Sequence, residues 1–180
     1  SLLASLQVAV HVSQAIIVAD MTAGLMLQLA EMKLKERNAL RKAGAAATSR
    51  AELERLADKA TVYYERSLQL YLAMQRGDFT GGTSEGPEGE LTFRDLSPSL
   101  SSLGIDLRAV SSAASSLGSL FCERGDHQDG IILFDRAAAL DAYYHGYSEM
   151  AEVTDGALLL VPHLYNLAAC HRAARDAPTT

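Results

Sequence analysis

Several residue types are scarce or missing in this sequence. It contains no tryptophan, four prolines and two cysteines among 180 residues, which excludes collagen-like, proline-rich and disulfide-rich secreted proteins. Aromatic residues make up 6% of the chain, but apolar residues make up 48%. This is enough for a core of mainly aliphatic side chains, so we expect most of the chain to fold.

Basic residues are outnumbered by acidic ones. The chain has 16 Lys and Arg against 22 Asp and Glu, which gives a formal net charge of -6. Proteins that bind nucleic acids neutralise phosphates with Lys and Arg. We therefore expect no nucleic-acid partner.

Charge is almost absent from the first 30 positions, where Asp20 is the single charged residue. Apolar residues recur there at i+3 and i+4, which predicts a helix that continues to about Lys42. A second apolar set lies beside this stripe, so we expect a central bundle helix that is covered on several sides. Polar residues such as His11, Gln14 and Gln28 interrupt the run and argue against a membrane span, which needs about 20 mostly apolar residues. The first set is Ala9, Val12, Ile16, Ala19, Ala23, Met26, Ala30 and Leu34, and the second is Val8, Val18, Leu25 and Leu29.

The start of the chain and its cysteines bear on its cellular context. The sequence begins at Ser1 without Met and lacks the charged start and cleavage site of a signal peptide, so we expect a part of a longer protein. Cys122 and Cys170 are too few for a disulfide framework and lie in predicted helices. A reducing, cytoplasmic location fits them best.

A second long helix is predicted after the first. Residues 49–52 form the S-x-x-E pattern of a capping box, so we expect this helix to begin at Ser49 and to end near Arg76, before Gly77. Residues 77–104 are rich in Gly, Ser, Pro and acidic side chains, which predicts a long mobile loop with a short turn at 93–96. Residues 1–76 are thus predicted to form the first helical half.

Residues 105–180 are predicted to form a second helical half. We expect one helix capped by Asp106 and ended by Gly125, and another capped by Asp126. A last helix is expected from about Ala157 or Pro162 to Arg175. The predicted fold class is all-α, with two antiparallel helical packings joined by the loop.

Two short motifs suggest functions that their context does not support. Residues 82–86 spell G-x-S-x-G, the nucleophile elbow of serine hydrolases, but no predicted strand precedes them. Arg-Gly-Asp occurs at 76–78 and at 124–126. Each copy lies where a helix should end, and Arg followed by Gly is typical of helix C-termini. We therefore interpret both copies as helix ends rather than adhesion motifs.

Metal or catalytic chemistry is not indicated by residue spacing. The histidines and cysteines show neither C-x-x-C nor H-x-x-x-H spacing, and a zinc site needs about four converging ligands. No phosphate-binding or nucleotide-binding loop is present. We expect no cofactor, no metal and no enzymatic activity; an enzyme that uses Asp20 or His171 would need a pocket that holds both an acid and a base. The candidate ligands considered were Cys122, His127, His145, His163, Cys170 and His171.

Part of the second half resembles a tetratricopeptide repeat. The match covers Leu117-Gly118, Phe121, Gly125-Asp126, Ile131, Phe134, Ala137 and Leu140-Asp141, and residues 166–170 resemble the start of another repeat. The 50 residues between Leu117 and Leu167 exceed the usual spacing of about 34. Ser115 and Ser119 also replace the Lys and Asn of the chaperone-binding clamp. A tetratricopeptide-like scaffold in a larger assembly is therefore the alternative function.

A second resemblance follows the whole chain. The matching residues are 29–33, 60–72, 134–137, 149–150 with Gly156, and 161–162 before Tyr165. In this order and with the long central loop, they resemble the C-terminal tandem MIT region of autophagy-initiating serine/threonine kinases. The resemblance implies two three-helix bundles in the non-catalytic part of such a kinase. It further implies binding to the kinase's regulatory subunit, help in membrane targeting, and a location at phagophore assembly sites. Tyr143, Tyr144 and His145 depart from the small residues usual there.

The predicted function is non-catalytic protein binding. We expect a groove between helices to accept a helical segment of a partner protein, with peripheral membrane association as an additional property of the tandem MIT resemblance. Exposed tyrosines are typical interface anchors. The predicted contact residues are Tyr63, Tyr71, Tyr143, Tyr144 and Tyr147.

Overall fold

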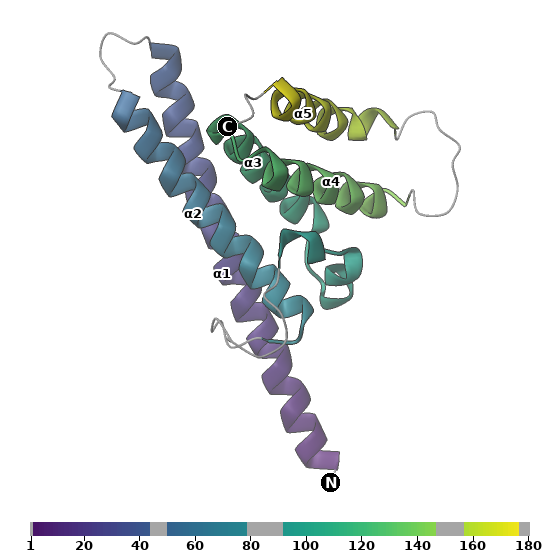
Figure 1. The fold of residues 1–180 in the computed structure, drawn as a ribbon. Coiled ribbons are helices and arrows are strands. Elements are labelled where there is room, and N and C mark those ends of the chain that lie inside the picture. Colours follow the sequence, from purple (N-terminus) through teal and green to yellow (C-terminus); the bar gives the residue numbers. More distant parts are fainter. Residues whose placement is uncertain (1, 44–49, 79–91, 147–156, 177–180) are drawn as a thin grey trace. The chain divides into compact units, whose positions relative to one another are not determined.

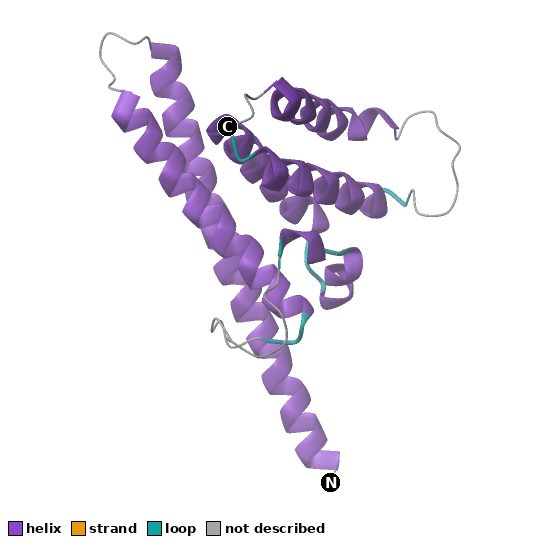
Figure 2. Cartoon of the chain, viewed as in Figure 1, coloured by secondary structure: helices purple, strands orange, loops and turns teal. Residues whose placement is uncertain are grey.

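The computed structural model describes residues 2–43, 50–78, 92–146 and 157–176. Helices make up nearly all of these residues, and none of the described residues forms a strand, as Figure 2 shows. The predicted all-α fold class is confirmed. The chain divides into two compact units, residues 1–91 and residues 92–180, and each is described by itself.

The N-terminal unit contains α1 (Leu2–Ala43) and α2 (Arg50–Gln75), which lie side by side as an antiparallel hairpin (Figure 1). Small side chains allow the two helices to approach closely. Ala23 and Ala30 of α1 and Ala60 of α2 are fully buried. Between the helices, the hydroxyl of Ser67 donates a hydrogen bond of 2.9 Å to the carbonyl oxygen of Ala23, which fixes the register of the hairpin.

Within the described residues of its own unit, α1 lacks the cover on several sides that the sequence predicts. Among the described elements of its unit, α2 is the helix that packs along it. Because α2 ends at Gln75, eight residues after the Ser67 contact, an antiparallel partner reaches back only to about residue 15 of α1. Residues 7–14 are all exposed. The prediction failed because apolar composition shows that a helix needs cover but not whether its own chain supplies it.

The C-terminal unit begins with two short 3-10 helices, η1 (Phe93–Asp95) and η2 (Pro98–Leu103). They precede α3 (Leu107–Arg124), α4 (His127–Tyr144) and α5 (Ala157–Asp176). The middle helix, α4, packs against both α3 and α5, whereas α3 and α5 meet over a much shorter stretch.

The core of the C-terminal unit is mainly aliphatic. Its side chains come from α3 and α4 and from the segment that precedes them. The most deeply buried include Leu96, Leu100, Val110, Leu117, Leu133, Phe134 and Leu140.

Several predicted helix ends are confirmed. The Asp106 side chain accepts a hydrogen bond of 2.9 Å from the backbone N–H of Arg108 at the start of α3. Gly125 ends this helix at a φ of 95°, and Gly77 follows α2 at a φ of 81°, which is a backbone region open to glycine without strain. Both Arg-Gly-Asp copies therefore lie at helix ends.

One predicted cap differs from the structure, and another is not tested by it. Asp126 occupies the N-cap position of α4, but its side chain makes no capping hydrogen bond. In α2, Glu52 accepts hydrogen bonds from Arg55 one turn later, and this guanidinium lowers the pKa of Glu52. Ser49, the other half of the expected capping box, lies outside the described residues, so this box stays a prediction.

The region predicted as a loop contains ordered structure at its C-terminal end. Both η1 and η2 fall within residues 77–104. Leu96 and Leu100, which are 1% and 0% exposed, belong to the core. The boundary between the units lies at 91/92. Residues 79–91, which include the G-x-S-x-G motif, lie outside the described residues.

Candidate functional site

A second apolar stripe runs along α1 and is not covered by α2. Its members are spaced by three, four, four and three residues, which is helical periodicity. Each side chain is between 38% and 64% exposed. The stripe consists of Val18, Met21, Leu25, Leu29 and Met32, and we refer to it as the outer stripe.

The outer stripe lies nearly opposite the face that packs on α2. At 100° per residue its five side chains fall within an arc of about 80°, and the centre of this arc is about 150° from that of the buried positions. The buried positions are Ala19, Ala23, Leu27 and Ala30. The helix thus has two apolar faces, and its hairpin partner covers one of them.

Polar side chains border the outer stripe on both edges. Thr22 and Lys33 lie along one edge, and Gln28 and Lys35 lie along the other. The stripe ends where Lys33 forms an ion pair of 2.8 Å with Glu36. A narrow apolar strip between polar borders is suited to another amphipathic helix.

By length and composition, α1 is also the one helix in the described part of the chain that could cross a membrane. An 18-residue stretch within Gln7–Ala43 has a mean hydropathy of 1.5, and 11% of it is buried. Within its own unit, this helix is therefore covered by α2 on one face and not on several sides. The polar residues that argue against a membrane span, His11, Gln14 and Gln28, are all exposed.

The five predicted tyrosines differ in their surroundings. Tyr71 is 2% exposed and belongs to the core, so its predicted place on the surface is wrong. Tyr63 is half-buried, and Tyr147 lies outside the described residues. Tyr143 and Tyr144, at the end of α4, are exposed. The Arg108 guanidinium lies 5.6 Å from the centre of the Tyr144 ring, within the range of a cation–π interaction.

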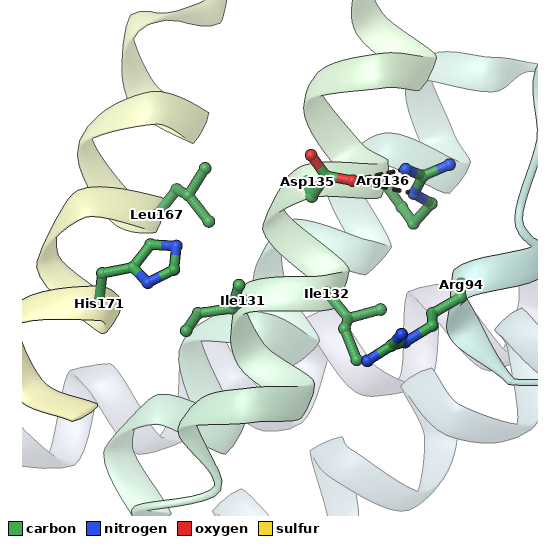
Figure 3. A pocket seen from close by; sticks show the side chains of 7 residues that line it. All are labelled: Arg94, Ile131, Ile132, Asp135, Arg136, Leu167 and His171. Atoms are coloured by element: carbon green, nitrogen blue, oxygen red, sulfur yellow. Dashed lines mark hydrogen bonds and ion pairs between the residues drawn. The ribbon is translucent and has the colours of Figure 1, made fainter. Parts of the chain in front are cut away.

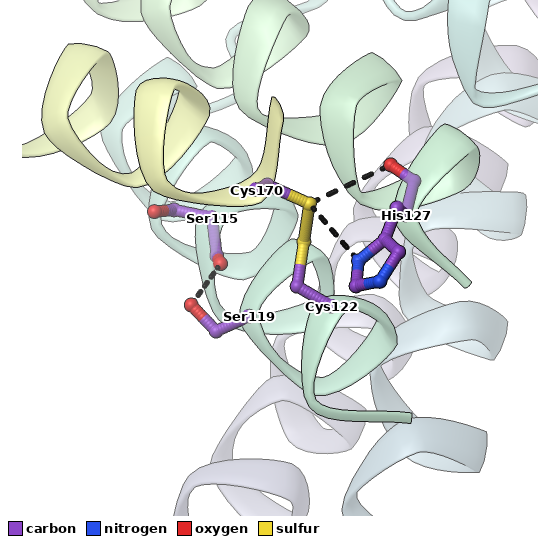
Figure 4. Close-up of a disulfide and its surroundings, with 5 residues drawn as sticks. All are labelled: Ser115, Ser119, Cys122, His127 and Cys170. Atoms are coloured by element: carbon purple, nitrogen blue, oxygen red, sulfur yellow. Dashed lines mark hydrogen bonds between the residues drawn. A yellow bond between two sulfur atoms is a disulfide. The ribbon is translucent and has the colours of Figure 1, made fainter. Parts of the chain in front are cut away.

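Cys122 and Cys170 form a disulfide between α3 and α5, with their Cα atoms 5.9 Å apart (Figure 4). This contradicts the expectation that both thiols are free, and it removes the argument from which we predicted a reducing location. His127, the first residue of α4, lies beside the bond. Its Nδ1 is 3.9 Å from Cys170 Sγ, and its backbone oxygen is 3.5 Å from the same sulfur.

Asp141 and His163 make a second polar link between α4 and α5. Asp141 Oδ2 lies 2.6 Å from His163 Nε2, and the two side chains are 18% and 10% exposed. This contact uses one of the two nitrogens of the His163 ring. Nδ1 is buried and has no hydrogen-bond partner among the described residues. With so little access, the pair is suited to holding α5 on α4 rather than to proton transfer.

A shallow pocket of about 300 Å³ lies in the C-terminal unit (Figure 3). Ile131, Ile132 and Leu167 give it an aliphatic floor. It includes an acid and a base, Asp135 and His171, but the Asp135 carboxylate is paired with Arg136 at 3.2 Å. The enzyme alternative needs an acid and a base that act together. The ion pair of Asp135 with Arg136 is not such an acid–base pair. Asp20, the other residue named for the enzyme alternative, lies on α1 in the N-terminal unit.

The sequence contained a sign of the outer stripe, since Val18, Leu25 and Leu29 stand out as a second apolar set. It gave no local sign of the Cys122, His127 and Cys170 cluster, because 48 residues separate the two cysteines. Comparisons with protein-family models, with characterised proteins and with solved structures give no match.

Proposed function

We propose that this chain is a non-catalytic protein-binding module whose outer stripe packs against an amphipathic helix of a partner protein. The supporting observation is the stripe itself: five exposed large apolar side chains at helical spacing on one face of α1. Large exposed apolar patches on soluble proteins commonly mark binding surfaces.

The size of the surface sets a requirement on the partner. Half-exposed side chains of this size gain about 1 kcal/mol each on burial, so the outer stripe contributes about 5 kcal/mol. Association alone costs about 4 kcal/mol or more. A stable complex therefore also needs Val10 and Ile17, which are exposed nearer the start of α1 and lie within about 80° of the centre of the stripe.

A helix is favoured over a bilayer as the occupant because of the polar borders. Lys33 and Lys35 flank the stripe near its C-terminal end, and a partner helix can pair with these charges while its own apolar face covers the stripe. A bilayer would have to accommodate these side chains at the edge of the buried face. Membrane binding is thus an outcome that the experiment must distinguish.

The experiment places a photo-crosslinking amino acid at Leu25, with the same substitution at Val62 as the matched control. Val62 is an exposed apolar residue on α2 outside the stripe. We expect position 25, but not position 62, to cross-link to an amphipathic segment of another protein. A synthetic peptide of that segment should bind the purified chain, and L25D/L29D should weaken binding at least about tenfold, a loss of about 1.4 kcal/mol.

The control V62D should leave the affinity unchanged. Equal effects of L25D/L29D and V62D would contradict the proposal. So would cross-linking at position 25 only to a second copy of the chain, or co-sedimentation with phospholipid vesicles that L25D/L29D abolishes.

The resemblance to the tandem MIT region suggests a specific partner, the regulatory subunit of an autophagy-initiating kinase, and a role in membrane targeting at phagophore assembly sites. Residues 29–33, which belong to that resemblance, overlap the outer stripe at Leu29 and Met32. Titration of the purified regulatory subunit into the chain tests this finer proposal by calorimetry. Binding that L25D/L29D weakens would support it, whereas a chain that binds other helices but not this subunit would favour the tetratricopeptide-like scaffold.

A further inference from the structure

Three metal-binding side chains from different helices converge in the C-terminal unit. Cys122 is in the last turns of α3, His127 begins α4, and Cys170 is in α5. Their ligand atoms all lie within 4.8 Å of one another, and the three side chains are buried or half-buried. Figure 4 shows the imidazole of His127 directed toward the two sulfur atoms.

The spacing is close to that of a tetrahedral zinc site. With metal–sulfur bonds of about 2.3 Å and metal–nitrogen bonds of about 2.0 Å, tetrahedral angles place sulfur and nitrogen ligands about 3.6 Å apart. Cys170 Sγ and His127 Nδ1 are 3.9 Å apart. The same bond lengths separate two sulfur ligands by about 3.8 Å, so the two sulfurs must move apart once the disulfide is broken. The Cα separation of 5.9 Å leaves room for that change through side-chain rotation.

The backbone of α4 leaves space for both sulfurs at Gly130. A Cβ atom there would lie 3.1 Å from Cys170 Sγ and would overlap Cys122 Sγ. Glycine at this position lets the two sulfur atoms rest against the helix, one turn from His127. The N-terminal end of a helix also favours negative charge, which assists thiolate formation.

The chemical nature of the three ligands indicates which metal ion they would bind. Thiolate and imidazole suit Zn²⁺, whereas Mg²⁺ and Ca²⁺ prefer oxygen. We propose that Cys122, His127 and Cys170 bind one zinc ion once their disulfide is reduced, with water in the fourth position. Zinc and the disulfide therefore exclude each other, and the cluster links α3, α4 and α5 in either redox state.

Zinc binding requires prior two-electron reduction of the S–S bond. A dithiol or phosphine reductant supplies two electrons, which together with two protons convert the S–S bond into two thiols. Metal binding then releases these two protons as both sulfurs become thiolates. His127 binds through the lone pair of Nδ1 and keeps its proton on Nε2.

Cobalt titration of the full chain tests the proposal, because Co²⁺ in a tetrahedral thiolate site gives intense visible bands. The reduced chain, freed of phosphine under argon, should bind one equivalent of Co²⁺ with such bands and lose them on addition of one equivalent of Zn²⁺. The oxidised chain should show none. A reduced chain without tetrahedral bands, or an oxidised chain that gives the same bands, would overturn the proposal.

His127→Gln tests the imidazole, with His171→Gln as the matched control on an exposed histidine of α5. H127Q should lower the Co²⁺ affinity at least about tenfold, because even the loss of a residue that only supports a metal ligand costs about that much. H171Q should leave the Co²⁺ affinity unchanged. Equal affinity of the two variants would exclude His127 as a ligand. If circular dichroism shows that H127Q has lost its helices, the proposal is tested instead by measuring the protons that the unmodified reduced chain releases on binding Zn²⁺. Release of two protons per Zn²⁺ would support the site, and release of none would overturn the proposal.

Discussion

At the scale of single residues, two glycines show how position decides the effect of the same side chain. A Cβ atom at Gly130 would overlap a sulfur atom and lie 3.0 Å from the backbone oxygen of Gly118. Gly24 is in the middle of α1, and a Cβ there would have no atom within 4 Å. The first position is closed to any side chain, and the second is open.

Gly130→Ala should therefore destabilise the chain by about 1–3 kcal/mol, because overpacking forces the helices apart. Gly24→Ala should stabilise it by about 0.5–1 kcal/mol, since alanine is the better helix former. Urea denaturation of both variants measures the two effects. Equal changes would show that the crossing of α3 and α4 is looser than the structure indicates.

At the scale of elements, the disulfide joins helices that have little other contact. It connects α3 to α5, which otherwise pack mainly on α4. The cross-link closes a segment with a sequence separation of 48 residues. For a loop of this length, chain entropy predicts a stabilisation of roughly 4 kcal/mol, and measured values are commonly about 2–4 kcal/mol.

We expect C122S/C170S to lower the free energy of unfolding of the C-terminal unit by about 2–4 kcal/mol under oxidising conditions. Under metal-free reducing conditions the difference should nearly vanish, because neither chain then has the bond. Denaturation followed by circular dichroism, with and without phosphine, makes the comparison. A variant as stable as the unmodified oxidised chain would contradict it.

At the scale of the whole molecule, the two units differ in how well each buries its own apolar surface. The described part of residues 92–180 forms three α-helices that pack in sequence around an aliphatic core and a disulfide. Residues 1–91 contain a hairpin whose longer helix exposes an apolar face. The energetic balance is therefore better for the C-terminal unit.

Expressed separately, residues 92–180 should unfold cooperatively in urea, whereas residues 1–91 should unfold at lower urea concentration and gain stability when a partner helix is added. Circular dichroism at increasing urea concentration measures both. An isolated N-terminal unit as stable as the C-terminal one would weaken the case that α1 requires a partner.

The sequence by itself determined the all-α class and most helix ends. Helical spacing of apolar residues, the Asp106 cap and the glycines at 77 and 125 act locally, so neighbouring residues are enough to predict them. The role of α1 was not determined in this way, because exposure depends on which other elements pack against it.

Only the tertiary structure decided which apolar face of α1 is covered, that Tyr71 is buried, and that Cys122 and Cys170 meet beside His127. Each of these depends on residues far apart in the sequence that approach when helices pack. Periodicity specifies that a helix has an apolar face, but contacts between helices specify what that face touches.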